Sequence, residues 1–146
     1  MLAFDLTSEN PDTWPEAIQH YPPRLRTNFD RGQLVFCDRS NGNLIDQTDD
    51  VYSGWPLRVY GSYFCLNMPW IGMFDKATGE GAMLLFDTPF DANALIVQEV
   101  ATGLNWPQVE WIASLRQFRY PRRASYRFID DGGYVRMAKM YREYAK

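Results

Sequence analysis

Short apolar segments separated by turn-forming residues run through most of this chain. In some segments the apolar residues alternate with polar ones, and in others they follow one another without a break. Segments of this kind, bounded by Gly, Pro, Asn and Asp, are typical of β-strands. The pattern predicts strands at residues 2–6, 33–37, 57–66, 70–74, 82–86, 94–100, 109–115 and 123–129, with a break at Gly61 that suits a β-bulge.

A hairpin is predicted early in the chain. The turn formers Asp38-Arg-Ser-Asn-Gly lie between the apolar run 33–37 and the apolar pair Leu44-Ile45. Within them Asn41-Gly42 is the dipeptide that best suits a tight hairpin turn, because both residues tolerate a positive φ. A second turn is expected at 75–81, where Gly and Thr interrupt the strand pattern.

A short helix is expected near the start of the chain. Thr13 is a suitable N-cap and Pro15 would occupy the first helical position. The helix would end at Tyr21, because a residue that precedes proline disfavours helical geometry.

A longer helix is predicted at the C-terminal end, after Asp130-Asp131-Gly-Gly, where acidic residues suit a helix N-terminus. One face carries Tyr134, Met137, Ala138, Tyr141 and Ala145, and the other carries mainly Arg136, Lys139, Arg142, Glu143 and Lys146. No Gly or Pro stops this helix before the last residue. We therefore expect it to lead toward another part of a larger protein.

These elements predict a mainly β fold, an antiparallel β-sandwich with a C-terminal α-helix. The segments between strands are too short for the helical crossovers that a parallel sheet needs. A length of 146 residues fits one domain. We expect residues 1–131 to form the sandwich, in part or whole, and residues 132–146 to form a linker helix.

Composition and charge exclude some classes of protein. The net charge of −3 argues against a general nucleic-acid binder, which needs a positive excess. No apolar run approaches the roughly 18 residues of a membrane span, and the first residues do not resemble a secretion signal. Cys37 and Cys65 lie in apolar runs and are expected to be buried thiols, although a disulfide stays open. The cellular compartment stays open as well.

Four segments, in this order, resemble a known protein architecture. They are Asn67-Met-Pro-Trp-Ile-Gly-Met-Phe-Asp75, Leu84-Leu-Phe-Asp-Thr-Pro-Phe-Asp-Ala92, Arg119-Tyr-Pro-Arg-Arg123 and Gly132-Gly-Tyr-Val-Arg-Met-Ala-Lys-Met-Tyr-Arg142. Together they resemble the β-sandwich region that precedes the catalytic barrel in certain large glycoside-hydrolase-like proteins. The resemblance covers residues 21–146.

The resemblance implies a sandwich, a linker helix and a carbohydrate context. It does not imply catalysis in this chain, because in that architecture the catalytic carboxylates lie on the barrel. The chain is short at both ends compared with such a sandwich. We therefore expect Met1 to fall partway into the domain.

Individual residues offer weak signals for catalysis. His20 is the single histidine, and we expect it to be a surface residue in a loop. The adjacent pairs Asp49-Asp50 and Asp130-Asp131 lack the facing geometry that glycoside hydrolysis requires. No pattern of metal ligands is present, so neither a catalytic residue, nor a metal, nor a cofactor is predicted.

Aromatic residues are the strongest candidates for binding a ligand. Trp55 and Trp106 each precede a proline, so they are expected in loops or at strand ends where they can stack on a sugar. Tyr120 is a third candidate, because Arg116, Arg119, Arg122 and Arg123 interleave with it and with Phe118. The alternative for the arginines is a solvated strand edge. Trp70 and Trp111, by contrast, are expected in the core.

Three functions remain open at this stage. The first is a non-catalytic accessory domain that supports or docks a glycoside-hydrolase-type barrel, with that barrel or a second copy of the chain as its partner. The second is a free-standing carbohydrate-binding module, and the third is an enzyme with an unrecognised carboxylate site. Neither nucleic acid nor a membrane is expected as a partner.

Overall fold

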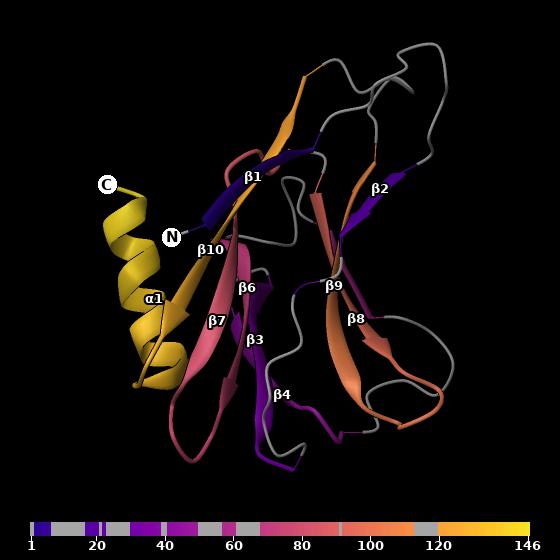
Figure 1. The fold of residues 1–146 in the computed structure, drawn as a ribbon, viewed down its shortest axis with the longest axis vertical. Coiled ribbons are helices and arrows are strands. Elements are labelled where there is room, and N and C mark those ends of the chain that lie inside the picture. The colour runs from indigo at the N-terminus through magenta and orange to yellow at the C-terminus, as the bar shows by residue number, and fades with distance from the viewer. Residues whose placement is uncertain are drawn as a thin grey trace.

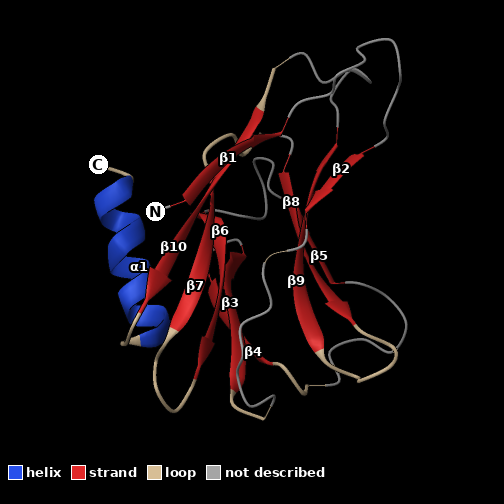
Figure 2. Cartoon of the chain, in the orientation of Figure 1, coloured by secondary structure: helices blue, strands red, loops and turns tan. Residues whose placement is uncertain are grey.

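The computed structural model describes residues 2–6, 17–20, 22, 30–38, 41–49, 57–60, 68–90, 92–112 and 120–146. These residues form ten strands and one helix (Figure 2). The strands are β1 (Leu2–Leu6), β2 (Ala17–His20), β3 (Gly32–Asp38), β4 (Asn41–Asp46), β5 (Leu57–Tyr60), β6 (Met68–Asp75), β7 (Gly81–Phe86), β8 (Ala92–Gln98), β9 (Asn105–Ile112) and β10 (Arg122–Ile129), and the helix is α1 (Gly133–Tyr144).

The strands form two antiparallel sheets that face each other (Figure 1). A six-stranded sheet has the order β1-β10-β7-β6-β3-β4, and a four-stranded sheet has the order β2-β9-β8-β5. The helix α1 lies on the outer face of the six-stranded sheet, away from the four-stranded one (Figure 1). The predicted sandwich with a C-terminal helix is therefore confirmed.

The main core lies between the two sheets. Phe86 and Trp111 meet there edge to face, with ring centroids 6.2 Å apart. The prediction that Trp70 and Trp111 are core residues is confirmed, because both are buried, Trp70 in the second core described next. The other members of the main core are Leu34, Phe36, Ile45, Ile71, Leu84, Ala92, Ala94, Ile96, Val109, Ala124 and Tyr126.

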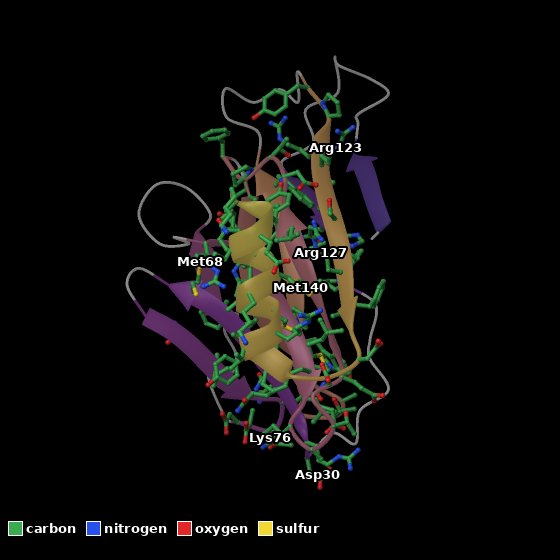
Figure 3. The ribbon with its side chains drawn as sticks, turned by 90° about the vertical axis from the view of Figure 1, so that its left-hand side faces the viewer. Asp30, Met68, Lys76, Arg123, Arg127 and Met140 are labelled. Atoms are coloured by element: carbon green, nitrogen blue, oxygen red, sulfur yellow. The ribbon has the colours of Figure 1, made fainter. Side chains whose placement is uncertain are left out.

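A second core lies between the six-stranded sheet and α1. Successive side chains of a strand point to opposite faces, so the neighbours of the first core's residues line this second one. Its buried members are Val35, Trp70, Phe74, Met83, Leu85, Ile129 and Met137. Figure 3 shows α1, which carries the labelled Met140, lying along the sheet. Because this sheet is buried on both faces, its central strands are apolar without alternation.

The helix is locked onto the sheet by one methionine. A Cβ placed on Gly72 would lie 2.5 Å from the Met137 Sδ, and one placed on Gly81 would lie 2.8 Å from the Met137 Cε. Gly72 and Gly81 thus leave a depression on neighbouring strands, and the fully buried Met137 side chain fills it. Residues with any larger side chain at these two positions would push the helix away from the sheet.

The start of α1 differs in detail from the sequence prediction. Asp130 and Asp131 precede the helix as expected, but the N-cap is Gly132, at φ 77°, and no side chain caps the helix. The helix is anchored instead by the Gly133 N–H, which donates to the Gly79 carbonyl at 3.0 Å. A left-handed conformation at Gly132 places this amide against the β6–β7 turn.

The face of α1 that contacts the sheet is shifted from the predicted one. Met137, Ala138, Met140 and Tyr141 pack on the sheet. All of these except Met140 are among the five positions predicted for this face. Tyr134 touches Phe74 with its ring but is 45% exposed, and Ala145 is exposed. Both lie at the ends of the helix, where its axis extends past the sheet's apolar centre.

The prediction of a helix after Thr13 is wrong for the residues of this segment that the structure describes. Residues Ala17–His20 form β2 and pair with β9 along Val109–Ile112. The local capping signal is overridden because β9 offers an unpaired edge in the four-stranded sheet. Thr13 and Pro15 themselves lie outside the described residues.

The predicted hairpin is present as β3–β4, but its turn is displaced. Asn41 and Gly42 belong to β4 and pair with Asp38 and Cys37. Arg39 and Ser40, between the two strands, lie outside the described residues. The break predicted at Gly61 lies outside the described residues. A register shift occurs elsewhere, between β3 and β6 beside Pro69, where a proline is tolerated because the ladder is already interrupted.

Gly72→Ala should lower the free energy of unfolding by about 1–3 kcal/mol, because the new methyl overlaps Met137 and Val35. Chemical denaturation of the variant and the parent measures this difference. Gly42→Ala is the matched control, since a Cβ there meets nothing within 4 Å. Equal losses in the two variants would contradict a depression specific to Met137.

Candidate functional site

The tryptophans proposed as sugar ligands have unequal support. Trp106 is the second residue of β9, at a strand end as predicted. Its side chain is only 9% exposed and packs with Met73 and Leu104. It therefore contributes to the core, and its role in ligand binding stays a prediction. Trp55 lies outside the described residues.

Tyr120 lies just before β10 and contacts Arg122, the first residue of that strand. The Arg122 guanidinium lies 3.6 Å from the centroid of the Tyr120 ring, and its Nη1 donates to the Tyr120 carbonyl at 2.7 Å. Arg122 is 1% exposed, so the prediction of a solvated arginine edge is wrong for this residue. The cation supports one face of an aromatic ring that is itself 44% exposed.

The two sheets are linked by a hydrogen bond between His20 and Tyr126. The His20 Nε2 lies 2.5 Å from the Tyr126 hydroxyl, and the two rings are 5.8 Å apart. His20 belongs to β2 in one sheet and Tyr126 to β10 in the other. Burial lowers the pKa of His20 and raises the pKa of Tyr126. The predicted surface position of His20 is therefore wrong: it is half-buried at the seam between the sheets.

A small apolar pocket opens beside this seam. It has a free volume of about 20 Å³. Tyr126 forms one side, and the remaining walls include Pro22, Ile71, Met73, Ala82, Leu84 and Pro107. Nearly all of these groups are apolar, so the pocket suits an apolar group better than a water molecule.

Phe128 lies beside two residues that line this pocket, Tyr126 and Ala82. It pairs with Ala82 across β10 and β7, and directly opposed residues share a face of the sheet. Its ring stacks on Tyr126, with centroids 6.2 Å apart and planes 18° apart, yet it is 56% exposed. The sequence placed Phe128 and Tyr126 on one face. It gave no signal that Phe128 would be exposed while Tyr126 is buried.

The far end of α1 is fixed by a polar cluster around Asp87. The Tyr144 hydroxyl and the Ser125 hydroxyl both donate to the Asp87 carboxylate, the latter at 2.5 Å. The Arg127 guanidinium lies 5.7 Å from the Tyr144 ring. In Figure 3, Arg127 lies between α1 and β10. Burial and the Asp87 carboxylate raise the pKa of Tyr144 to about 12, so this phenol remains a donor at neutral pH.

The buried carboxylates that the structure describes serve structural bonds. Burial raises the pKa of Asp75, but the Ala77 and Thr78 amides and the Arg31 guanidinium outweigh that effect and lower it. The Arg31 Nη2 lies 2.8 Å from Asp75 Oδ2. Glu110 accepts from the Asn93 amide at 3.2 Å.

The predicted acidic pairs and thiols are placed as follows. Asp49 accepts from the Asp46 backbone amide, whereas Asp50 lies outside the described residues. Asp130 and Asp131 are exposed ahead of the helix. Cys37 is buried as a free thiol, and Cys65 lies outside the described residues.

The described part of the chain carries neither a cluster of metal-ligating side chains nor a membrane-spanning helix. Among those residues no three His, Cys, Asp or Glu side chains gather where they could hold a metal ion. The helix in the same part of the chain is neither long enough nor apolar enough to cross a membrane.

The fold is similar to part of a known glycoside hydrolase. One solved structure of the α-N-acetylgalactosaminidase NagBb from Bifidobacterium bifidum, a Gal-NHAc-DNJ complex, superposes with a TM-score of 0.62 at 20% identity. The match covers 81% of this chain and 20% of that chain. The GalNAc complex of NagBb gives a TM-score of 0.62 at 19% identity, covering 88% of this chain and 23% of that one.

These matches establish the fold, and they do not extend to the whole enzyme. This chain spans about one fifth of the length of the NagBb structures. No model of a known protein family matches the sequence, and no curated protein matches it. The chain thus resembles one domain of a glycoside hydrolase, which confirms the coarser part of the resemblance seen in the sequence motifs. The position of that domain before a catalytic barrel stays a prediction.

Acidification should destabilise the protein through His20. Because burial lowers the folded-state pKa below the unfolded value near 6.5, the unfolded state binds the proton more readily. Stability contributed by neutral His20 is complete above pH 6.5 and falls as the pH drops through that value toward the folded-state pKa. His20→Gln should lose less stability between pH 7.5 and 5.5, roughly the window in which His titrates, as measured by denaturation midpoints. Identical pH profiles would contradict this assignment, since the chain has no other histidine.

Tyr144→Phe should loosen the last turn of α1 while leaving the centre of the helix in place. Loss of one half-exposed hydrogen bond to Asp87 should cost about 0.5–1 kcal/mol. Amide hydrogen exchange should accelerate at Arg142–Ala145 and stay unchanged at Met137. Uniform acceleration along the helix would show that Asp87 holds more than its end.

Proposed function

We propose that this chain is a non-catalytic accessory β-sandwich domain of a glycoside-hydrolase-like protein, and that α1 supports or docks a catalytic barrel. The observation that carries the proposal is the partial match to NagBb. More than four fifths of this chain matches a glycosidase of which it represents only about one fifth. An accessory role also fits a domain whose described buried carboxylates are engaged in structural bonds.

The anchoring of α1 supports a role in setting the direction of an attached domain. The helix is bound at its start by the Gly133 amide, at its centre by Met137 and at its end by Tyr144. Three attachments along one helix leave little freedom to tilt. A domain joined to such a helix would inherit a defined orientation relative to the sandwich.

The outward face of α1 has the character of a docking surface. Val135 is 45% exposed, and Lys139, Arg142 and Lys146 follow it at helical spacing on the same side. An exposed valine flanked by cations suits a partner surface that combines an apolar contact with carboxylates. Residues of the opposite face, such as Met137, are already used by the sheet.

A carbohydrate-binding module is the second candidate, and exposed aromatic rings favour it. Tyr120 is supported by Arg122 and leaves part of its ring accessible. Phe90 and Phe128 are exposed on other described segments. These rings distinguish the two candidates, because an accessory domain needs the helix face and a binding module needs a ring that contacts sugar.

The accessory role is tested by isolating the natural polypeptide with an antibody raised against this chain. We expect a polypeptide several times larger than 17.0 kDa that hydrolyses nitrophenyl glycosides, including the α-N-acetylgalactosaminide. The purified 146-residue chain should hydrolyse none of them. The larger mass follows from the one-fifth coverage of the NagBb chain.

Two results would contradict the proposal. A natural polypeptide of 17.0 kDa would remove the barrel from the same chain, and hydrolysis by the purified 146-residue chain would make it catalytic. As a control for the helix face, Lys139→Glu with Arg142→Glu should leave the isolated chain as stable as the parent, since both side chains are exposed. In the larger polypeptide the same pair should separate one thermal transition into two.

A further inference from the structure

We infer that the pocket between the sheets, together with the neighbouring Phe128, is a binding site for a pyranose that carries a methyl group. The methyl can belong to a 2-acetamido group or to a 6-deoxy sugar. This inference goes beyond the accessory role, because it concerns the seam of the sandwich and not α1. It rests on the shape, lining and exposed ring of the described residues.

Phe128 provides the platform for the sugar ring. More than half of its surface is exposed, while one side of the ring is fixed by parallel stacking on Tyr126. A flat apolar ring that is exposed and held in one orientation can be covered by a ligand with little loss of side-chain entropy. The apolar face of a pyranose is flat and of similar size, so it can stack on this ring.

The adjoining pocket matches the size of a methyl group. Its free volume of about 20 Å³ accommodates a single group of about the size of a water molecule. Ala82, directly opposite Phe128, forms part of the wall, so a sugar stacked on the ring would place one substituent at the opening. The walls formed by Ile71, Met73 and Leu84 favour a methyl over a hydroxyl.

The His20–Tyr126 pair supplies polar groups at the same place. Tyr126 lines the pocket and stacks under Phe128, and its hydroxyl is bonded to the His20 imidazole. A phenol oxygen has one donor and two acceptor positions, so it can take part in more than one hydrogen bond. An apolar pocket beside a stacking ring and a fixed polar pair is the usual composition of a sugar site.

The two other exposed aromatic residues lack this combination. Phe90 follows β7 in the turn closed by the Ala92 amide and the Pro89 carbonyl, at the opposite end of the strand from Ala82. Tyr120 is supported by Arg122 but lies ahead of β10, at the other end of that strand from Phe128. Both therefore serve as comparison positions for Phe128.

The inference is tested by titrating the ¹⁵N-labelled chain with monosaccharides and following its amide resonances. We use N-acetylgalactosamine and D-fucose, which is 6-deoxygalactose, as the methyl-bearing sugars and galactose as the sugar without a methyl group. Saturable shifts should centre on Tyr126, Phe128 and Ala82. Affinity for at least one methyl-bearing sugar should exceed that for galactose by about fourfold, as expected for burial of one methyl.

Substitutions then locate the site. Phe128→Ala should weaken binding about tenfold without unfolding the protein, because the ring is largely exposed. Phe90→Ala is the matched control and should bind as the parent does. Ala82→Val should reduce the preference for the methyl-bearing sugar by filling the pocket, even if stacking on Phe128 persists.

Four results would overturn the inference. They are the absence of saturable binding by the folded chain, equal affinity for galactose, unchanged binding by Phe128→Ala, and loss of binding in Phe90→Ala or Tyr120→Ala alone. Binding of N-acetylgalactosamine only, or of fucose only, would support it and identify the source of the methyl. The titration uses this chain without a barrel. Absence of sugar binding would therefore overturn this inference without deciding the accessory role, which the isolation of the natural polypeptide tests separately.

Discussion

The insertion of Met137 between Gly72 and Gly81 is the contact on which the rest of the structure depends. The six-stranded sheet has apolar side chains on both faces, and the four-stranded sheet covers only one of them. Without α1, the rings of Trp70 and Phe74 would face water. Two glycines on neighbouring strands allow the helix to approach closely enough to exclude it. The sandwich and the helix thus form one packing unit through the second core.

The two faces of this sheet are held by different interactions. On the helix side, the described contacts at the centre of α1 are apolar and depend on shape, and the polar bonds that the structure describes between α1 and its surroundings lie at its ends. On the other side, the His20–Tyr126 bond joins the sheets next to a small unfilled pocket. Complementary packing gives the helix side its rigidity. The seam between the sheets has free space and an exposed ring, and for that reason it is where a ligand could be accommodated.

Much of the fold could be predicted from the sequence, because the apolar pattern of a strand depends on how many of its faces are buried. Continuous apolar runs such as those in β6 and β7 identified the central strands, and the heptad-like spacing around Met137 identified the helix. The predictions that were wrong concern residues whose structure depends on contacts outside their own segment. The strand at Ala17–His20 forms because β9 has a free edge, and Arg122 is buried because Tyr120 folds over it. Phe128 lies in the same alternation as the buried Tyr126, and that pattern does not distinguish the exposed ring from the buried one.

The pairing of β1 with β10 has a consequence for how the molecule forms during synthesis. Leu2–Leu6 must remain without its partner until Arg122–Ile129 has left the ribosome, and the helix that covers the outer face follows later still. Contacts between residues so distant in sequence close slowly, since the entropy of ordering the intervening chain opposes them. Until β10 and α1 have been synthesised, the edge of β7 is therefore unpaired and the outer apolar face of the sheet is uncovered. The passage of the nascent chain to the native state depends on protection from neighbouring nascent chains during that interval.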